Sequence, residues 1–366
     1  MSATLRRAAA QCVKELEQFL RDPLSVGLSF LLPFIMMLIF GFAIRLEAHD
    51  LPLAVVDQDR TDLSRTIVER LVATNVFHLV AVDPARLERV LDDGSARGAI
   101  LIAPQTQQSF QSNRSATIQA VIDGADVVNA QIIKNYAQAT AASIAAAGRP
   151  KVRPEVRLWF NPGRREALYI VPGVYAIVLG LFPAMLVAIG VARDREEGTL
   201  LQVYVSAMSA FEYLSGKVAA YVAVGLVQAI LLFTAGALLW GLVPRGDPTP
   251  LLVCTPLFLT AIVSLGLMVG ARTTTQSAAV QAVATVSNLP AVLFTGFLYP
   301  LENIPWPLSL ISNLVPARYF IGVTRDVFVR GSGWLGVWPA VPALAGLALL
   351  FFGVAWLTSR KMQLRA

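Results

Sequence analysis

The sequence predicts an α-helical membrane protein with six transmembrane helices and one α/β domain inserted between the first and second of them. Six stretches of more than twenty residues contain no Asp, Glu, Lys, Arg or His. They are residues 23–44, 167–192, 218–244, 248–271, 273–301 and 331–359. A helix of roughly 20 apolar residues crosses the hydrocarbon core of a bilayer, which is about 30 Å thick. Only helices and closed barrels satisfy their backbone hydrogen bonds in lipid, so each stretch is expected to form a transmembrane helix.

Composition favours the same class of protein, and the charge distribution predicts its orientation. Hydrophobic residues make up 55% of the chain and charged residues 15%, and the mean hydropathy is +0.60. The pI near 9.5 does not indicate nucleic-acid binding, because outside the long external segment most Lys and Arg residues lie on one side of the six spans. The positive-inside rule places that side, and both termini, in the cytoplasm.

These boundaries divide the chain into spans, connecting segments and one domain. We expect transmembrane helices at residues 23–44, 167–192, 218–244, 248–271, 273–300 and 335–359. Between and beside them we expect a cytoplasmic amphipathic helix at 1–22, an external α/β domain at 45–166, a cytoplasmic loop with a short helix at 193–217, external re-entrant or interfacial helices at 301–330, and a cytoplasmic tail at 360–366.

The segment before the first span has the pattern of an amphipathic helix that ends at Pro23. Its expected apolar face is formed by Val13, Leu16, Phe19 and Leu20, and its polar residues are Lys14, Glu15, Glu17 and Arg21. Basic amphipathic helices lie in the plane of the membrane interface. Anchoring alone would explain this segment, and a mechanical role is the alternative. The first span is too long for the apolar core of a signal peptide and is expected to be a retained anchor.

Residues 45–166 alternate between strand-like and helical patterns. The strand-like runs are 53–56, 76–82, 98–103 and 117–122, and the helical runs are 63–74, 84–93 and 125–147. This alternation predicts a small α/β domain with a mixed sheet. The loop that carries Asp57, Asp59 and Asp62 lacks the Gly and the terminal Glu of a calcium-binding loop. The chain has only two His residues. No metal site is therefore expected.

The fifth span is the most polar of the six. Ser277, Gln281, Thr285, Asn288 and Thr295 fall on one helical stripe. This stripe predicts either a face that lines a translocation path or hydrogen bonds between helices, which polar residues commonly form in membrane bundles. Pro290 and Gly296 predict a bend or break toward its outer end. The six stretches contain no acid or base, so the sequence offers no candidate for a buried proton relay.

The charge run that follows the second span is the strongest local signal. Residues 193–198 contain five charged residues and a glycine, and Thr199 with Gln202 has the pattern of a capping box. The next apolar residues, which include Leu200, Tyr204 and Met208, have helical spacing. This pattern predicts a short amphipathic helix at the membrane face. The helix is either a simple connection or a docking element for a cytoplasmic partner.

Taken together, these motifs resemble those of ABC-2 type membrane permeases, the transmembrane subunits of ATP-binding-cassette exporters. The resemblance covers essentially the whole chain. It rests on Lys14-Glu15, Arg21-Asp22-Pro23, the runs 55–59, 161–162 and 169–173, Arg195-Glu196-Glu197-Gly198-Thr199, Gly216-Lys217, the run 296–300, Pro305-Trp306, the run 316–320 and Arg325. The large domain after the first span resembles the bacterial drug-efflux subset of the family.

This resemblance implies a division of labour between subunits. The residues that would couple to an ATPase subunit are Arg195, Glu196, Glu197, Gly198, Thr199 and Gln202, with Lys14, Glu15, Arg21 and Asp22 in support. The chain is expected to bind no cofactor, because Phe211 stands where a phosphate-binding loop ending at Gly216-Lys217 requires glycine. ATP and Mg would be bound by cytoplasmic ABC ATPase subunits. One departure is that Ser206 is followed by Ala207, where the family often has proline soon afterwards, which leaves the end of the coupling helix undefined.

The expected function is export across a bacterial inner membrane. Two permease copies, identical or paralogous, are expected to form the path through the lipid bilayer for amphiphilic or hydrophobic substrates such as drugs or lipids. A periplasmic membrane-fusion adaptor is a further expected partner. The alternative is a mechanotransmission or signalling subunit that moves its external domain without transport. A membrane-embedded enzyme is disfavoured, because the sequence places no convergent set of acids, bases and nucleophiles in the spans.

Overall fold

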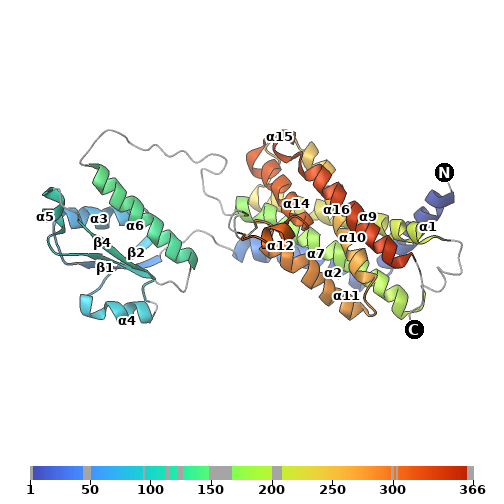
Figure 1. The fold of residues 1–366 in the computed structure, drawn as a ribbon, viewed down its shortest axis with the longest axis horizontal. Helices are drawn as coiled ribbons and strands as arrows, with labels where there is room; N and C mark the ends of the chain where they lie inside the picture. The colour runs from blue at the N-terminus through green and yellow to red at the C-terminus, as the bar shows by residue number, and fades with distance from the viewer. Residues whose placement is uncertain are drawn as a thin grey trace. The chain divides into compact units, whose positions relative to one another are not determined.

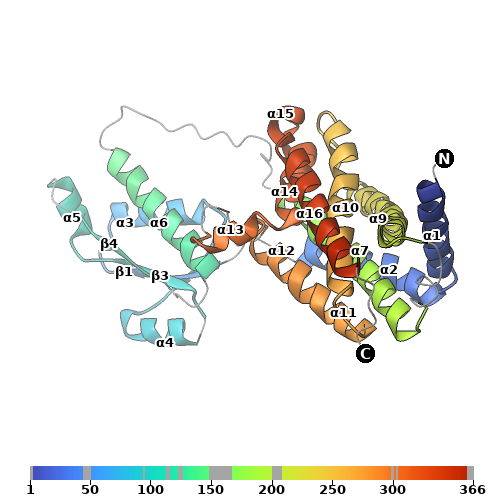
Figure 2. The same ribbon diagram turned by 45° about the vertical axis from the view of Figure 1, so that its right-hand side comes forward.

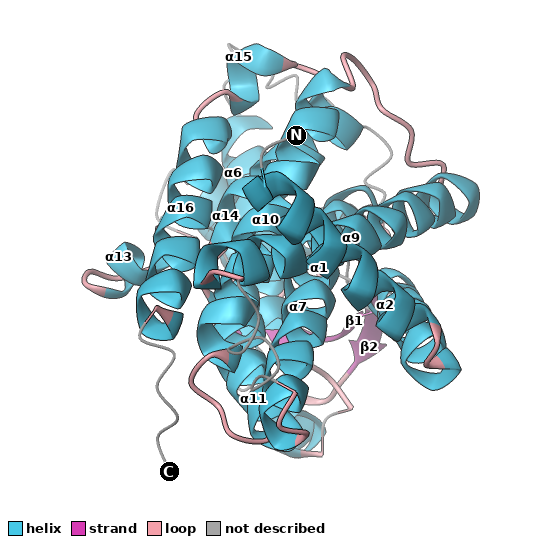
Figure 3. Ribbon diagram, turned by 90° about the vertical axis from the view of Figure 1, so that its right-hand side faces the viewer, coloured by secondary structure: helices cyan, strands magenta, loops and turns pink. Residues whose placement is uncertain are grey.

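The computed structural model describes residues 3–43, 51–93, 95–112, 116–122, 127–147, 167–199, 208–297, 301 and 304–360. The chain forms two compact units. One is Arg45–Arg157, and the other combines Met1–Ile44 with Leu158–Ala366. Within the described residues, strands occur only in the first of these units, and the second is built from helices and loops, as the colours of Figure 3 show.

The smaller unit is an α/β domain with a mixed sheet, as the sequence predicts. Its strands are β1 (Leu51–Asp57), β2 (Phe77–Ala81), β3 (Gly98–Ile102) and β4 (Ile118–Ile122). They are ordered β2-β1-β3-β4, and β1 is parallel to both neighbours while β3 and β4 are antiparallel. The helices are α3 (Asp62–Val72), the short η1 (Pro84–Arg86), α4 (Leu87–Asp92), α5 (Thr106–Gln111) and α6 (Val127–Ala147).

The helices of this domain cover both faces of the sheet, with α3 and α6 on one face and α4 on the other (Figure 1). Successive residues of a strand point to opposite faces. Leu53 therefore packs with Ile67 of α3 and Ile133 of α6, whereas Ala54 packs with Val90 of α4. The acidic turn after β1 caps helices, because Asp59 accepts hydrogen bonds from the backbone N–H groups of Thr106 (3.2 Å) and Gln107 (3.0 Å).

Among the described residues, five helices are long and apolar enough to cross a membrane. They are α2 (Pro23–Ala43), α7 (Ala167–Glu196), α9 (Ala210–Trp240), α10 (Thr249–Gly270) and α16 (Ala340–Ser359). Helix α7 packs against α2, α9 and α10 and is central to the unit (Figure 2). In an apolar stretch of 18 residues, 83% of the residues of α7 are buried, compared with 17% for α2. Helix α7 therefore forms the core and α2 lies at the edge.

Small residues allow α7 and α10 to approach closely. A Cβ atom added at Gly266 would lie 2.3 Å from the carbonyl oxygen of Ala184, and one added at Gly270 would lie 2.9 Å from the Cα atom of Ala188. Spacing of small residues by four is typical of helix contacts in membranes, where packing rather than the hydrophobic effect drives association.

The expected fifth span differs from a single long helix. It consists of α11 (Gln276–Val283), the π-helical turn η2 (Ala284–Asn288) and α12 (Leu289–Leu293), and the helical path ends at Leu293 rather than at residue 300. Pro290 explains the π-turn, because its ring clashes with the carbonyl four residues earlier and widens the helix locally. Gly296 then takes a positive φ of 77°. The predicted break is present, and this segment is not one of the five long helices.

Short helices follow in the region expected at residues 301–330. They are α13 (Leu308–Ser312), α14 (Pro316–Arg325) and the π-helical η4 (Asp326–Arg330). Helix α14 packs against α7, α10 and α16, and its Phe320 ring stacks on Phe258 with centroids 4.2 Å apart. Helix α14 is largely buried within the bundle. The last span also begins later than expected, because α15 (Trp334–Val337) is separate from α16.

The helices around the expected coupling loop extend well beyond the apolar stretches. Helix α7 continues to Glu196 instead of ending at residue 192, and α9 begins at Ala210 instead of residue 218. The positive φ of Gly198 (68°) follows the end of α7. A capping box between Ser209 and Glu212 starts α9. Caps rather than the ends of the apolar stretches therefore set these boundaries.

Candidate functional site

Helix α1 (Ala3–Leu20) packs along α9 through a face that the sequence pattern did not predict. Its buried residues are Gln11, Glu15 and Phe19. Val13 and Leu20 of the expected apolar face are 54% and 67% exposed. The expected apolar face is therefore buried only in part, at Phe19, and Glu15 of the expected polar residues is buried beside it. The physical reason is that α1 meets a buried cation, so a carboxylate fits its contact face.

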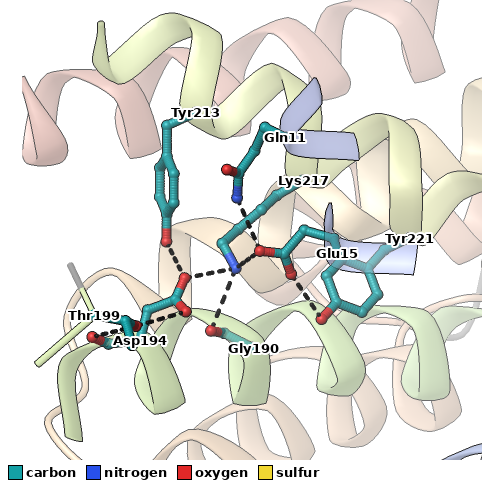
Figure 4. Close-up of polar contacts among 8 residues, drawn as sticks. All are labelled: Gln11, Glu15, Gly190, Asp194, Thr199, Tyr213, Lys217 and Tyr221. Atoms are coloured by element: carbon teal, nitrogen blue, oxygen red, sulfur yellow. Dashed lines mark hydrogen bonds and ion pairs between the residues drawn. The ribbon is translucent and has the colours of Figure 1, made fainter. Parts of the chain in front are cut away.

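That cation is Lys217 of α9, which lies at the centre of a buried cluster drawn in Figure 4. Its Nζ atom lies 2.6 Å from Oε1 of Glu15 and 2.8 Å from Oδ2 of Asp194, and it donates to the carbonyl of Gly190 at 3.3 Å. The side chains of Lys217, Glu15 and Asp194 are 0%, 1% and 4% exposed. Three helices, α1, α7 and α9, therefore meet at one ammonium group.

Uncharged donors complete the surroundings of Glu15. The side-chain amide of Gln11 donates to Oε1 of Glu15 at 2.9 Å, and the hydroxyl of Tyr221 donates to Oε2 at 3.3 Å. Gln11 comes from the preceding turn of α1, and Tyr221 from the turn of α9 that follows Lys217. Each oxygen of this carboxylate therefore has a donor.

Asp194 likewise accepts hydrogen bonds from uncharged donors, one in α9 and one in the segment after α7. The hydroxyl of Tyr213 donates to Oδ2 of Asp194 at 2.6 Å, and the hydroxyl of Thr199 donates to Oδ1 at 3.2 Å. Because Thr199 follows Gly198, this hydrogen bond connects the cluster to the beginning of the expected coupling helix. Gln202 and the rest of that helix, residues 200–207, lie outside the described residues.

Full hydrogen bonding explains why the cluster can be buried. An isolated buried ion is strongly unfavourable, and a buried ion pair is tolerated only when its remaining donors and acceptors are satisfied. The three hydrogens of the Lys217 ammonium match three acceptors, in Glu15, Asp194 and Gly190. A fully satisfied polar network of this kind is rigid.

The two residues that follow Asp194 bond elsewhere, to the turn between α10 and α11 and to the first residue of α11. Nη1 of Arg195 donates to the carbonyl oxygen of Thr273 at 3.1 Å. The carboxylate of Glu196 accepts from the backbone N–H of Gln276 at 3.0 Å and from its side-chain amide at 2.6 Å. The C-terminal end of α7 is therefore bonded to the turn before α11 and to the N-terminal end of α11. In this contact Glu196 is exposed to solvent and Gln276 is half-buried.

The other expected coupling residues lie near these contacts without joining them. Lys14 is exposed on α1, and Arg21 forms an exposed pair with Glu17 at 3.8 Å. Asp22 caps α2, because it accepts from the hydroxyl of Ser25 at 2.5 Å and from its backbone N–H at 3.1 Å. These hydrogen bonds from Ser25 lower the pKa of Asp22. Glu197 is exposed at the end of α7.

The predicted polar stripe of the fifth span is only partly continuous. Ser277, Gln281 and Thr285 share an exposed face. Asn288 is half-buried, and its Oδ1 atom has no hydrogen-bond partner among the described residues. Thr295 is buried, and its hydroxyl donates to the carbonyl of Ala291, so it does not extend the exposed face.

The sequence reasoning missed Asp194, Tyr213 and Tyr221 and placed Lys217 in a loop. A signal was present, since Asp194 and Lys217 each lie within two residues of a long apolar stretch. Because these charges lie so close to apolar stretches, the sequence could have suggested that both helices extend to include them and that the two charges form a pair. Their mutual distance was not readable, because 22 positions of sequence separate them and packing between α7 and α9 brings them together.

Comparisons with known proteins agree with the helical architecture. The sequence model of the family described as ABC-2 family transporter protein matches residues 24–357. The probable multidrug ABC transporter permease YbhS of Escherichia coli is 25% identical, with 97% of each chain covered. The probable multidrug ABC transporter permease YbhR of the same organism is 25% identical, over 89% of this chain and 92% of the relative. The inner membrane transport permease YhhJ of Escherichia coli is 27% identical over 85% of each chain.

Proposed function

Because this chain belongs to the ABC-2 family of transporter proteins, we propose that it is the permease subunit of an ABC exporter driven by a separate cytoplasmic ATPase subunit. The observation that carries this proposal is the bonding of Arg195 to Thr273 in the turn before α11 and of Glu196 to Gln276, the first residue of α11. Those two residues belong to the segment expected to meet the ATPase. The helical segment that begins with α11 carries the polar residues expected to line the path.

In this mechanism the ATPase subunit docks on the segment that begins at Glu197 and moves the end of α7 when it closes on ATP and Mg. The bonds from Arg195 to the Thr273 carbonyl and from Glu196 to Gln276 transmit that movement to α11. Ser287 anchors the opposite face of the same segment, since its hydroxyl donates to the carbonyl of Gly180 in α7 at 2.8 Å. The movement therefore rotates or tilts the segment from α11 to η2, which α7 holds at Gln276 and at Ser287.

The exposed polar face of α11 and η2 supports the presence of a second permease copy. Ser277, Gln281 and Thr285 are polar and exposed on a segment next to apolar helices. Polar groups facing lipid are unfavourable. Pairing with an identical or paralogous permease would place two such faces opposite each other and form a path of uncharged polar groups. Amphiphilic or hydrophobic molecules, such as drugs or lipids, suit a path without fixed charges.

The proposal also includes the location of the protein. In it the protein lies in a bacterial inner membrane with both termini in the cytoplasm and the α/β domain in the periplasm, as the distribution of Lys and Arg predicts. That domain is then available to a membrane-fusion adaptor. Relatives whose names include multidrug transport support a drug-like substrate class.

Reconstitution with the ATPase subunit tests the proposal. The full chain and the ATPase are placed in vesicles, and ATP-dependent movement of ethidium is followed together with ATP hydrolysis. We expect Glu197→Ala to abolish the stimulation of hydrolysis by ethidium while the two subunits still co-purify. Glu17→Ala, a matched loss of an exposed glutamate, is expected to behave as the unmodified protein. Normal stimulation in Glu197→Ala would refute the docking assignment, and ATP hydrolysis by the permease alone would refute the division of labour.

A further inference from the structure

We propose that Lys217 is a positioning residue that fixes α1 to the coupling end of α7, so that α1, the end of α7 and the beginning of α9 move as one body. This inference rests on the proposed function, because it concerns how movement at the ATPase contact is transmitted. It assigns α1 a mechanical role instead of a peripheral anchoring role.

The first observation is that the attachment of α1 is polar and buried. Phe19 is the single buried apolar residue of α1, and the other buried residues of this helix are Gln11 and Glu15. A helix held only by lipid would direct its apolar residues into the lipid and its carboxylates to water. Here Glu15 is directed at Lys217 with an oxygen–nitrogen distance of 2.6 Å.

The second observation is steric and does not depend on charge. A Cβ atom added at Gly216 would lie 2.6 Å from Cβ of Gln11 and 2.7 Å from the carbonyl oxygen of Ala8. Real Cβ atoms do not approach backbone oxygens this closely, so any other residue at position 216 displaces α1. Glycine at position 216 allows the close approach, and lysine at position 217 provides the ion pair.

The third observation connects this attachment to the coupling segment. Lys217 pairs with Glu15 of α1 on one side and with Asp194 of α7 on the other. Asp194 in turn accepts from the hydroxyl of Thr199, the residue at which the expected coupling helix begins. A displacement of Thr199 is therefore passed to α1 through two carboxylates and one ammonium group.

The native Cys12 reports whether α1 stays attached. It is half-buried next to Gln11, and burial and then the Glu15 carboxylate raise the pKa of its thiol. The full chain in vesicles is labelled with a maleimide, and a Cys12→Ser variant gives the background from Cys254, which is buried in α10. We expect Lys217→Met to raise the labelling rate of Cys12 by at least about tenfold. Loss of the positive charge by itself would raise the thiol pKa further and slow labelling, so faster labelling reports release of α1.

A variant without charge change keeps the test decisive if Lys217→Met does not fold. Gly216→Ala is expected to raise the Cys12 labelling rate at least about fivefold. Its matched control is Gly353→Ala in α16, where an added Cβ atom meets no atom within 4 Å. Labelling at the unmodified rate in both Gly216→Ala and Lys217→Met would overturn the proposal.

A coupling measurement separates positioning from simple stability. With the ATPase subunit present, the number of ethidium molecules moved per ATP hydrolysed is expected to fall several-fold in Glu15→Gln and to stay unchanged in Glu17→Gln. A purely structural role would lower the yield of folded protein without changing this ratio, and an unchanged ratio would overturn the proposal. If the unmodified protein moves no ethidium, the proposed function fails for this probe, whereas the labelling experiment still decides whether α1 is held by Lys217.

Discussion

Asp194 and its two successors, Arg195 and Glu196, form two very different contacts at the same end of α7. Asp194 lies in the buried cluster, where its carboxylate is 2.8 Å from the Lys217 ammonium and 4% exposed. Arg195 bonds to the turn before α11 and Glu196 to the first residue of α11, through hydrogen bonds that are partly or fully exposed to solvent. Consecutive residues of one helix thus contact α9 on one side and α11 on the other.

The difference in burial indicates a difference in strength. Breaking a buried ion pair leaves an uncompensated charge in a medium of low dielectric constant, whereas exposed pairs exchange readily with water. We therefore interpret the Lys217 cluster as a permanent joint and the contact between α7 and α11 as a releasable one. An ATP-driven movement would keep the first and change the second.

Removing the shared cation should have the largest effect. We expect Lys217→Met to lower the free energy of unfolding by about 3–5 kcal/mol, because Glu15 and Asp194 then face each other without a counter-charge. Unfolding in denaturant followed by tryptophan fluorescence measures this loss. Adding Glu15→Gln to Lys217→Met should recover part of it. If the double variant is less stable than Lys217→Met alone, the two carboxylates do not repel each other as the geometry requires.

The two tyrosines of the cluster give a graded comparison. Tyr213→Phe removes a 2.6 Å hydrogen bond to Asp194, and a hydrogen bond to a charged group contributes about 1.5–3 kcal/mol. Tyr221→Phe removes a longer bond of 3.3 Å to Glu15 and is expected to have a smaller effect. The same denaturant measurement ranks the two variants. The opposite order would indicate that the α1 side of the cluster is the stronger one.

Thr199 tests how firmly the coupling segment is tied to the permanent joint. Thr199→Val removes the hydroxyl that donates to Asp194 at 3.2 Å. We expect a loss of about 0.5–1.5 kcal/mol, less than for Tyr213→Phe, because this bond is longer and only partly buried. Thr285→Val is the matched control, because Thr285 is exposed and its hydroxyl donates to the backbone carbonyl of Gln281, one turn earlier in the same helical segment. Equal stability of both variants would show that Thr199 is not part of the cluster.

Glu196 should show the smallest effect on stability and a clear effect on function. Exposed substitutions usually change stability by less than about 0.5 kcal/mol, and we expect this of Glu196→Ala. Stimulation of the ATPase by ethidium should nevertheless fall, because α7 no longer holds Gln276. Combining Glu196→Ala with Gln276→Ala should cause no further loss, since both changes break one contact. If the two losses of stimulation were additive, Glu196 and Gln276 would act through different contacts.

Much of the architecture is readable from the sequence, for reasons that apply locally. A run of twenty uncharged apolar residues is a helix in lipid whatever its neighbours are, and five of the six expected spans are found as long helices. The alternation of strand and helix patterns likewise predicts the mixed sheet of the smaller unit. Pro290 marked the place where the fifth expected span loses regular α-helical geometry.

The candidate site was predictable only in outline. The charge run at residues 193–198 identified the end of α7, and Glu15 was selected with it, but neither pattern revealed that Glu15 is buried. Amphipathicity assigns apolar residues to the buried side of a helix. That rule fails for α1, because the surface that it meets presents an ammonium group.

The sequence by itself determined which segments are apolar enough to enter a membrane and where an α/β domain is inserted, since both depend on composition and periodicity within each segment. Only the tertiary structure decided that Lys217 lies inside a helix and that Glu15 and Asp194 reach it from two other helices. It also decided that Arg195 and Glu196 bond to the turn before α11 and to its first residue. The physical reason is that a buried charge is stable only beside its partners, and those partners are brought together by packing between distant parts of the chain.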